Sequence, residues 1–293
     1  MLLGPDARQQ SAEALTALRR AADAGDGEAA KQFATFQASG AWTPRNWELA
    51  LDYLQIGAES GSASADGQLT VLACAEGSPA ERRRRIQPGY WLDPEPTRRP
   101  LIERPRVRAS GGFTTPAVCE WLIGLARGRL TRAKMVEGYG AEAQYTEART
   151  NSDFTFTIFD GDCVLAMVRE RISVLLKLPI AHMEPPQVFH YLPGQELRPH
   201  VDYLQRVGRS AADYQGDRIA TFLLYLSEDF DGGETWFVRP DFKAKGRTGD
   251  ALYFANVGPD GAPDPESLHA GLPPTRGEKW LLSQWVHDRP FTG

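Results

Sequence analysis

The sequence contains little cysteine and no long apolar run. Cys74, Cys119 and Cys163 are an odd number at wide spacing, which argues against both a disulfide framework and a CxxC metal site. We therefore expect them to be buried as small apolar side chains. The mean hydropathy of -0.40 leaves no room for a membrane-spanning stretch. Because the first residues also lack the basic start and apolar segment of a signal peptide, we expect a cytoplasmic protein.

An excess of positive charge is also missing. The chain has 33 lysines and arginines against 38 acidic residues, whereas nucleic-acid binders gain most of their affinity by neutralising phosphates. This balance disfavours a nucleic-acid partner, and with it an oxygenase that repairs nucleic-acid bases. The run of arginines at 82–85 is a local exception, and we interpret it as a solvated part of a linker.

An alanine-rich helical pattern begins the chain. From residue 11 to about 77, apolar residues recur at spacings of three and four, as in amphipathic helices. The residues around Gly25 match those around Gly61, and each glycine is placed to end a helix. The pattern resembles tetratricopeptide-like repeats. We therefore predict a small all-α, helical repeat region at 1–77, which either braces the fold or recruits a protein substrate.

A proline-rich segment separates this region from the rest of the chain. Its prolines exclude a long helix or a central strand, so we predict an extended Pro/Arg-rich linker at 78–108 and a second domain at 109–293. That domain begins with helical patterns after Thr115 and near 164–178. Short β-type runs follow at 187–191, 219–226, 235–238, 251–254 and 280–286. We predict an α+β fold around a sandwich or double-stranded β-helix (jelly-roll).

His200 and Asp202 carry the first chemical signal. They follow a predicted strand, in which residues two apart point to the same side, so both side chains would face one cavity. His269, far along the chain, would complete a set of two imidazoles and one carboxylate. Such a set leaves half of an octahedral iron site open for a co-substrate and oxygen. It also suits zinc, so a zinc hydrolase is an alternative.

Lys279 carries the second signal. A turn-forming segment at 273–277 separates it from His269 and could fold the next strand back beside that ligand. A lysine that points inward there is costly unless a carboxylate pairs with it. The far carboxylate of 2-oxoglutarate would be such a partner. Alternatively, Lys279 lies on the surface beside Glu278.

Conspicuous sequence blocks surround these residues. They are FHYLPGQ at 189–195, PHVD at 199–202, RIATFLLYL at 218–226, GGET at 232–235, GDALYF at 249–254, and HAG with GEKW at 269–271 and 277–280. With these blocks in this order, residues 103–288 resemble the prolyl 4-hydroxylase family of iron and 2-oxoglutarate dioxygenases.

The resemblance implies a role for each matching residue. His200, Asp202 and His269 match the iron ligands, which form the catalytic centre. Lys279 matches the residue that binds the distal carboxylate of 2-oxoglutarate, and Tyr191 and Thr235 match hydroxyl groups that help to hold it. Positions near the peptide substrate are matched by Arg218, Trp285 and His287. The cofactors implied are Fe(II), 2-oxoglutarate and O2, with ascorbate as an optional reductant.

The resemblance further implies hydroxylation of a prolyl residue in a protein or peptide. A free amino acid or another small molecule as substrate stays an alternative, as does a non-enzymatic repeat adaptor. Collagen is disfavoured, because the chain has neither a signal peptide nor paired cysteines. Two loops beside the metal ligands, 203–217 and 256–268, are predicted to close over the substrate. His190 stands where the family often has arginine, and we interpret it as structural.

Overall fold

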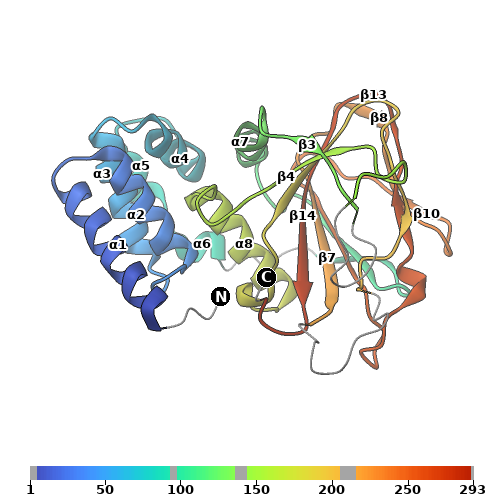
Figure 1. Cartoon of the computed structure of the whole chain (residues 1–293). Helices are drawn as coiled ribbons and strands as arrows, with labels where there is room; N and C mark the ends of the chain where they lie inside the picture. Colours follow the sequence, from blue (N-terminus) through green and yellow to red (C-terminus); the bar gives the residue numbers. More distant parts are fainter. Residues whose placement is uncertain (1–4, 93–97, 136–143, 205–215, 292–293) are drawn as a thin grey trace. The chain divides into compact units, whose positions relative to one another are not determined.

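The computed structural model describes residues 5–92, 98–135, 144–204 and 216–291, and the chain divides into two compact units (Figure 1). A helical unit comprises Met1–Glu95 and Thr157–Lys177, and a second, mainly β unit comprises Pro96–Phe156 and Leu178–Gly293. The α+β class with a jelly-roll core and a helical N-terminal region is therefore confirmed. Among the described residues, no helix is both long and apolar enough to cross a membrane.

The first helices of the helical unit pack in sequence order. They are α1 (Pro5–Asp23), α2 (Gly27–Ser39), α3 (Trp47–Glu59) and α4 (Ala63–Ala73). Gly25 and Gly61 follow α1 and α3 with φ of +95° and +88°, a backbone region that favours glycine. Side-chain oxygens of Asp26 and Ser62 then accept from the first amides of α2 and α4. The predicted helices are present, and their assignment to a repeat family stays a prediction.

The segment 78–108 is not an extended linker as predicted. It contains α5 (Pro79–Arg85) and α6 (Pro88–Leu92), then β1 (Arg99–Ile102) and the start of β2 (Val107–Ser110). Proline is tolerated at the first position of a helix, and Ser78 and Glu81 form a capping box around Pro79. The proline therefore begins a helix here rather than preventing one.

The arginine run in α5 is partly structural, which corrects its interpretation as a solvated stretch. Arg82 is buried and donates to the backbone carbonyl of Asp66 at 2.9 Å. It also contacts the Asp66 carboxylate and the Thr70 hydroxyl. Arg83 pairs with Glu48 and Asp52 of α3. These contacts fasten α5 to α3 and α4.

Helix α8 (Cys163–Leu176) belongs to the helical unit, although the sequence placed it in 109–293. Its buried face contacts α2, α4 and α6, and the Cys163 amide donates to Gln68 of α4 at 3.0 Å. Cys119 and Cys163 are buried as predicted. Cys74 is instead exposed, because it is the left-handed residue that ends α4.

The β unit contains two facing antiparallel sheets and helix α7 (Pro116–Ala126), which Thr115 caps. The large sheet has the order β1-β2-β11-β7-β14-β5-β4-β3, and the small sheet has the order β10-β9-β12-β6. In the large sheet the remaining bounds are β3 (Thr131–Arg132), β4 (Ser152–Thr155), β5 (Gln187–Tyr191), β7 (Arg218–Tyr225), β11 (Ala251–Ala255) and β14 (Lys279–His287). The small sheet consists of β6 (Leu197–His200), β9 (Thr235–Phe237), β10 (Phe242–Ala244) and β12 (His269–Gly271). A further pair joins β8 (Phe230–Gly232) to β13 (Pro274–Gly277).

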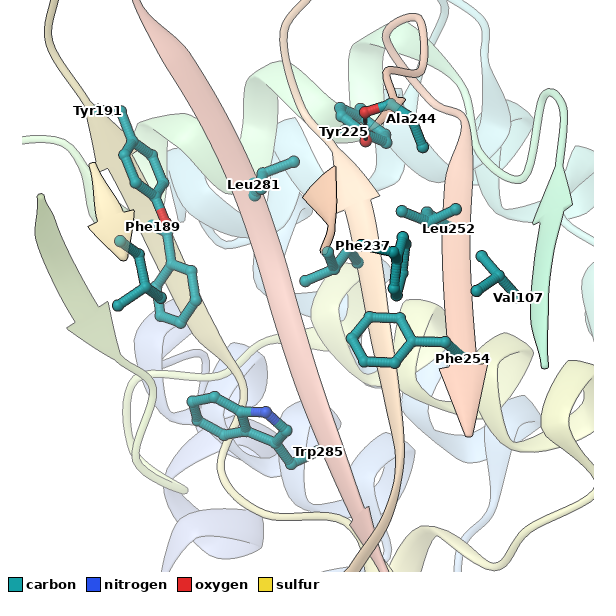
Figure 2. Close-up of a cluster of buried hydrophobic side chains, with 12 residues drawn as sticks. Val107, Phe189, Tyr191, Tyr225, Phe237, Ala244, Leu252, Phe254, Leu281 and Trp285 are labelled. Atoms are coloured by element: carbon teal, nitrogen blue, oxygen red, sulfur yellow. Dashed lines mark hydrogen bonds between the residues drawn. The ribbon is translucent and has the colours of Figure 1, made fainter. Parts of the chain in front are cut away.

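The space between the two sheets holds an apolar core (Figure 2). Phe237 of the small sheet meets Phe254 of the large sheet edge to face, with ring centroids 5.1 Å apart. Tyr191, Leu281 and Trp285 extend this core along β5 and β14. The core stops at the polar side chains described next, where the sheets enclose a pocket.

Candidate active site

Three side chains that can bind a metal meet in the small sheet. His200 ends β6, Asp202 follows it, and His269 begins β12, which pairs with β6 so that His269 lies opposite His200. One ligand atom from each residue lies within 4.8 Å of the others. The closest approaches are 3.4 Å between His200 Nε2 and Asp202 Oδ1 and 3.7 Å between His269 Nε2 and Asp202 Oδ2. Strand pairing thus joins groups that are far apart in the sequence.

Each histidine ring is held by a backbone carbonyl. His200 Nδ1 lies 2.9 Å from the carbonyl oxygen of Arg198, and His269 Nδ1 lies 2.9 Å from that of Ser267. Since a carbonyl can only accept, each Nδ1 carries a proton, which leaves each Nε2 as the ring atom that can bind a metal. Burial, together with the charge of His200, lowers the pKa of His269 to about 4. His269 is therefore a neutral ligand at pH 7.

Asp202 is oriented by a short hydrogen-bond chain. Thr221 Oγ1 donates to Asp202 Oδ2 at 2.6 Å, and Asn256 Nδ2 donates to Thr221 Oγ1 at 3.0 Å. Burial alone would raise the pKa of Asp202, but the two histidines and the Thr221 hydroxyl hold it well below its usual range. Thr221 and Asn256 are not among the predicted site residues. A hydroxyl within the apolar run at 219–226 is the signal that points to Thr221.

Lys279 lies across the pocket from the metal-binding groups. It begins β14 in the large sheet, is fully buried, and its Nζ has no hydrogen-bond partner within the part of the chain that the structure describes. Burial lowers the pKa of Lys279 to about 7, against the opposing charge of Glu234. The segment predicted to be a simple turn contains β13, which pairs with β8 and leads into the large sheet. Lys279 therefore faces His269 across the pocket instead of lying beside it in the same sheet.

Tyr191 and Thr235 lie in the same pocket as Lys279. Tyr191 is opposite Lys279 in the β5–β14 ladder, with the lysine Nζ 4.8 Å from the centre of its ring. Thr235 is buried at the start of β9. Burial raises the pKa of Tyr191 to about 12, so its hydroxyl stays protonated and can donate a hydrogen bond. The pocket thus brings two hydroxyl-bearing side chains and the lysine together.

The pocket that joins these groups contains about 390 Å³ of space that no protein atom fills, part of which is open to solvent. Its apolar walls include Phe189 and Leu281, which Figure 2 shows on the same side of the large sheet as Tyr191 and Trp285. Two imidazoles and a carboxylate on one wall fit a ferrous ion with open positions. The unpaired ammonium on the other wall fits a carboxylate. The pocket therefore suits a metal-chelating dicarboxylic acid.

Arg218, Trp285 and His287 gather around Glu184, which the sequence did not single out. The Arg218 guanidinium donates to both Glu184 oxygens, at 2.5 Å and 2.9 Å, and His287 Nε2 lies 2.6 Å from Glu184 Oε1. The same guanidinium lies 3.8 Å from the centre of the Trp285 ring. Of the three predicted residues, Trp285 lines the pocket, and Arg218 and His287 lie beyond it in this network.

The two predicted substrate loops differ in what the structure describes. Most of 203–217 lies outside the described residues. In 256–268, Val257 bridges Pro263, and the short helix η3 (Pro265–Ser267) begins with Asp264 as its cap. This loop also supplies the Ser267 carbonyl that holds His269. His190 points away from the pocket, where it stacks on Trp280 and contacts Glu278, in keeping with a structural role.

An open metal site in a jelly-roll pocket with a carboxylate anchor defines a 2-oxoglutarate-using oxygenase, and comparisons with known proteins agree. Residues 186–287 match the 2OG-Fe(II) oxygenase superfamily. The chain is 35% identical to probable prolyl 4-hydroxylase 6 of Arabidopsis thaliana over 67% of this chain and 74% of that protein. Identity to prolyl 4-hydroxylase 2 of the same plant is 33%, over 65% of this chain and 70% of that protein. The viral collagen prolyl hydroxylase of Paramecium Bursaria Chlorella virus-1, solved with 2OG, is 26% identical, with a TM-score of 0.48 over 62% of this chain and 95% of that one.

The chain therefore belongs to the prolyl 4-hydroxylase family within the 2OG-Fe(II) oxygenase superfamily. It is a dioxygenase whose cofactors are Fe(II), 2-oxoglutarate and O2, and these predictions are confirmed. The residues of the pocket fit this chemistry, because the metal-binding triad and the unpaired Lys279 face each other.

Proposed function

We propose that this protein hydroxylates prolyl residues in a protein or peptide. The observation that carries the proposal is the pocket itself, in which a metal-binding set of two histidines and one aspartate on the small sheet faces a buried lysine on the large sheet, whose Nζ has no hydrogen-bond partner among the described residues. The relatives named prolyl 4-hydroxylases support the choice of substrate.

Different residues of the chain would have different roles in this reaction. Fe(II) with 2-oxoglutarate supplies the oxidative chemistry, in which O2 gives one oxygen atom to the substrate C–H bond and one to succinate, with loss of CO2. His200, Asp202 and His269 would hold the metal, and Lys279 would pair with the distal carboxylate. Tyr191 and Thr235 would donate hydrogen bonds to that carboxylate. Apolar walls such as Phe189, Leu223 and Leu281 exclude water from the reacting groups.

The peptide would enter where Trp285 lines the pocket. Its indole packs against the Arg218 guanidinium, which donates hydrogen bonds to both carboxylate oxygens of Glu184. We propose that Arg218, Trp285 and His287 contact the substrate or hold the groups that do. A free amino acid, the alternative substrate, would place its own ammonium and carboxylate groups here. Comparing the turnover of peptidyl proline with that of free proline distinguishes the two substrates.

Oxygen-dependent conversion of 2-oxoglutarate to succinate tests the reaction, together with the gain of one oxygen atom by proline-containing peptides. His200→Ala or Asp202→Ala should abolish both, since each removes a metal-binding group. His190→Gln is a matched control, because His190 lies on the other face of the sheet. Turnover that survives in the triad variants would refute the metal assignment. Metal analysis of anaerobically purified protein should find iron, and stoichiometric zinc with hydrolysis instead would favour a hydrolase.

A further inference from the structure

Ser283 is a buried hydroxyl with no assigned role. It is 1% exposed, lines the pocket, and its Oγ has no hydrogen-bond partner among the residues that the structure describes. Its strand, β14, is paired on both sides, with β7 and β5, so the neighbouring backbone groups are occupied by the ladders. A buried polar group without a partner is destabilising, and alanine at this position would avoid that cost. A ligand that supplies the missing partner would offset it.

The position of Ser283 along β14 indicates which part of a ligand it would meet. Alternate residues of this strand, Lys279, Leu281, Ser283 and Trp285, line the pocket in that order. The metal end of the pocket is marked by Thr221, which donates to Asp202 and is opposite Trp285 in the β7–β14 ladder. A molecule that extends from Lys279 to the metal therefore passes Leu281 first and reaches Ser283 next.

The chemistry of 2-oxoglutarate matches this order. Its distal carboxylate suits Lys279, its two methylene groups suit Leu281, and its keto-acid end lies at the metal. A carboxylate that binds a metal through one oxygen keeps lone pairs that can accept a further hydrogen bond. We propose that Ser283 is a positioning residue that donates a hydrogen bond to the metal-proximal carboxylate of 2-oxoglutarate. This proposal rests on the role of the same pocket in the proposed function.

A hydroxyl in this place would orient the chelating end without carrying charge. Lys279 fixes only the far end of the co-substrate, about which the keto-acid group could still rotate. A second anchor near the metal-binding groups would select one orientation of the keto-acid end. Orientation of this kind acts on the rate as well as on binding.

Anaerobic calorimetry of the Fe(II)-loaded protein with 2-oxoglutarate tests the proposal. Ser283→Ala should raise the Kd roughly tenfold, the value of one hydrogen bond to a charged group. Ser283→Thr keeps the hydroxyl and should stay within about threefold of the wild type. The Km for the peptide should not change in either variant, and equal unfolding temperatures of the three proteins would exclude a general loss of structure.

A shortened ligand locates the contact. 2-Oxobutyrate has the keto-acid end but lacks the distal carboxylate, so in competition with 2-oxoglutarate Ser283→Ala should weaken it by a similar factor, whereas Lys279→Met should not. If the wild type binds 2-oxoglutarate and Ser283→Ala binds it equally well, the proposal for Ser283 is wrong and the proposed function is unaffected. A raised peptide Km with an unchanged 2-oxoglutarate Kd would likewise overturn it, in favour of a substrate contact. A wild-type protein that binds no 2-oxoglutarate would instead refute the proposed function.

Discussion

If Lys279 binds 2-oxoglutarate as proposed, the affinity for this co-substrate should depend on pH. Its Nζ is buried without a hydrogen-bond partner among the described residues, and burial lowers the pKa of its ammonium group to about 7. A carboxylate ligand pairs only with the protonated form, so the bound state has a higher pKa than the free state. Below the free pKa the lysine is already charged and affinity should be constant. Above it, each binding event must take up a proton, and affinity should fall as the pH rises.

The size of this effect follows from the pKa of about 7. Each pH unit above that value should raise the Kd about tenfold until the pKa of the complex is reached. Between pH 6 and pH 8.5 the rise should be roughly 30-fold, and at pH 8 about 0.9 proton should be taken up per 2-oxoglutarate bound. A surface lysine with an ordinary pKa near 10.4 would give almost no change over this range.

Calorimetry in buffers with different ionisation enthalpies measures both the Kd and the proton uptake. Lys279→Arg is the matched variant, because a guanidinium stays charged at every pH in the range. Its affinity should be lower in absolute terms, since the longer side chain must fit the same buried position, but its pH profile should be flat. A flat profile in the wild type, or proton uptake that persists in Lys279→Arg, would show that Lys279 does not titrate on binding.

Three further variants test other parts of the structure. Thr221→Val removes the hydroxyl that orients Asp202 and should weaken Fe(II) binding roughly 10- to 100-fold in anaerobic titrations, whereas unchanged affinity would contradict that support. Glu184→Gln should raise the peptide Km through Arg218 and leave the 2-oxoglutarate Kd unchanged, and the opposite pattern would place Glu184 at the co-substrate. Arg82→Ala should lower the free energy of unfolding of the helical unit by about 1–3 kcal/mol in urea denaturation, and no measurable loss would mean that α5 is held by other contacts.

The long strands and the helices could be predicted because their patterns are local. Strands β5, β7, β11 and β14 correspond to apolar runs, and Thr115 begins α7 as expected from its capping position. Apart from β9 (Thr235–Phe237), which the run at 235–238 predicts, the short strands could not be predicted, since strands of two to four residues depend on pairing partners rather than on their own composition. Pro79 shows a different limit of prediction from the sequence. Proline ends or begins a helix according to its position, and the capping box around it decides the outcome.

The residues of the site also divide into those that the sequence could predict and those that it could not. His200, Asp202 and His269 could be proposed from residue type and spacing, and Lys279 from the block that contains it. Glu184 could not, because its partner His287 lies 103 residues away and no local pattern joins them. The side of the pocket on which Lys279 lies could not be predicted from the sequence either. It depends on β13, whose pairing with β8 leads the chain from one sheet to the other.

Strand β14 explains how these separate groups keep fixed distances. It pairs with β5 over Lys279–Ser283 and with β7 over Leu281–His287, so the two ladders together set its register. Its alternate residues carry the ammonium group of Lys279, the hydroxyl of Ser283 and the indole of Trp285 into one pocket, while Trp280 on the opposite face stacks on His190. Because side chains alternate with a period of two, a slip of one residue would remove all three groups from the pocket at once. The two ladders of β14 therefore position Lys279, Ser283 and Trp285 relative to the metal-binding groups, which come from short strands of the other sheet.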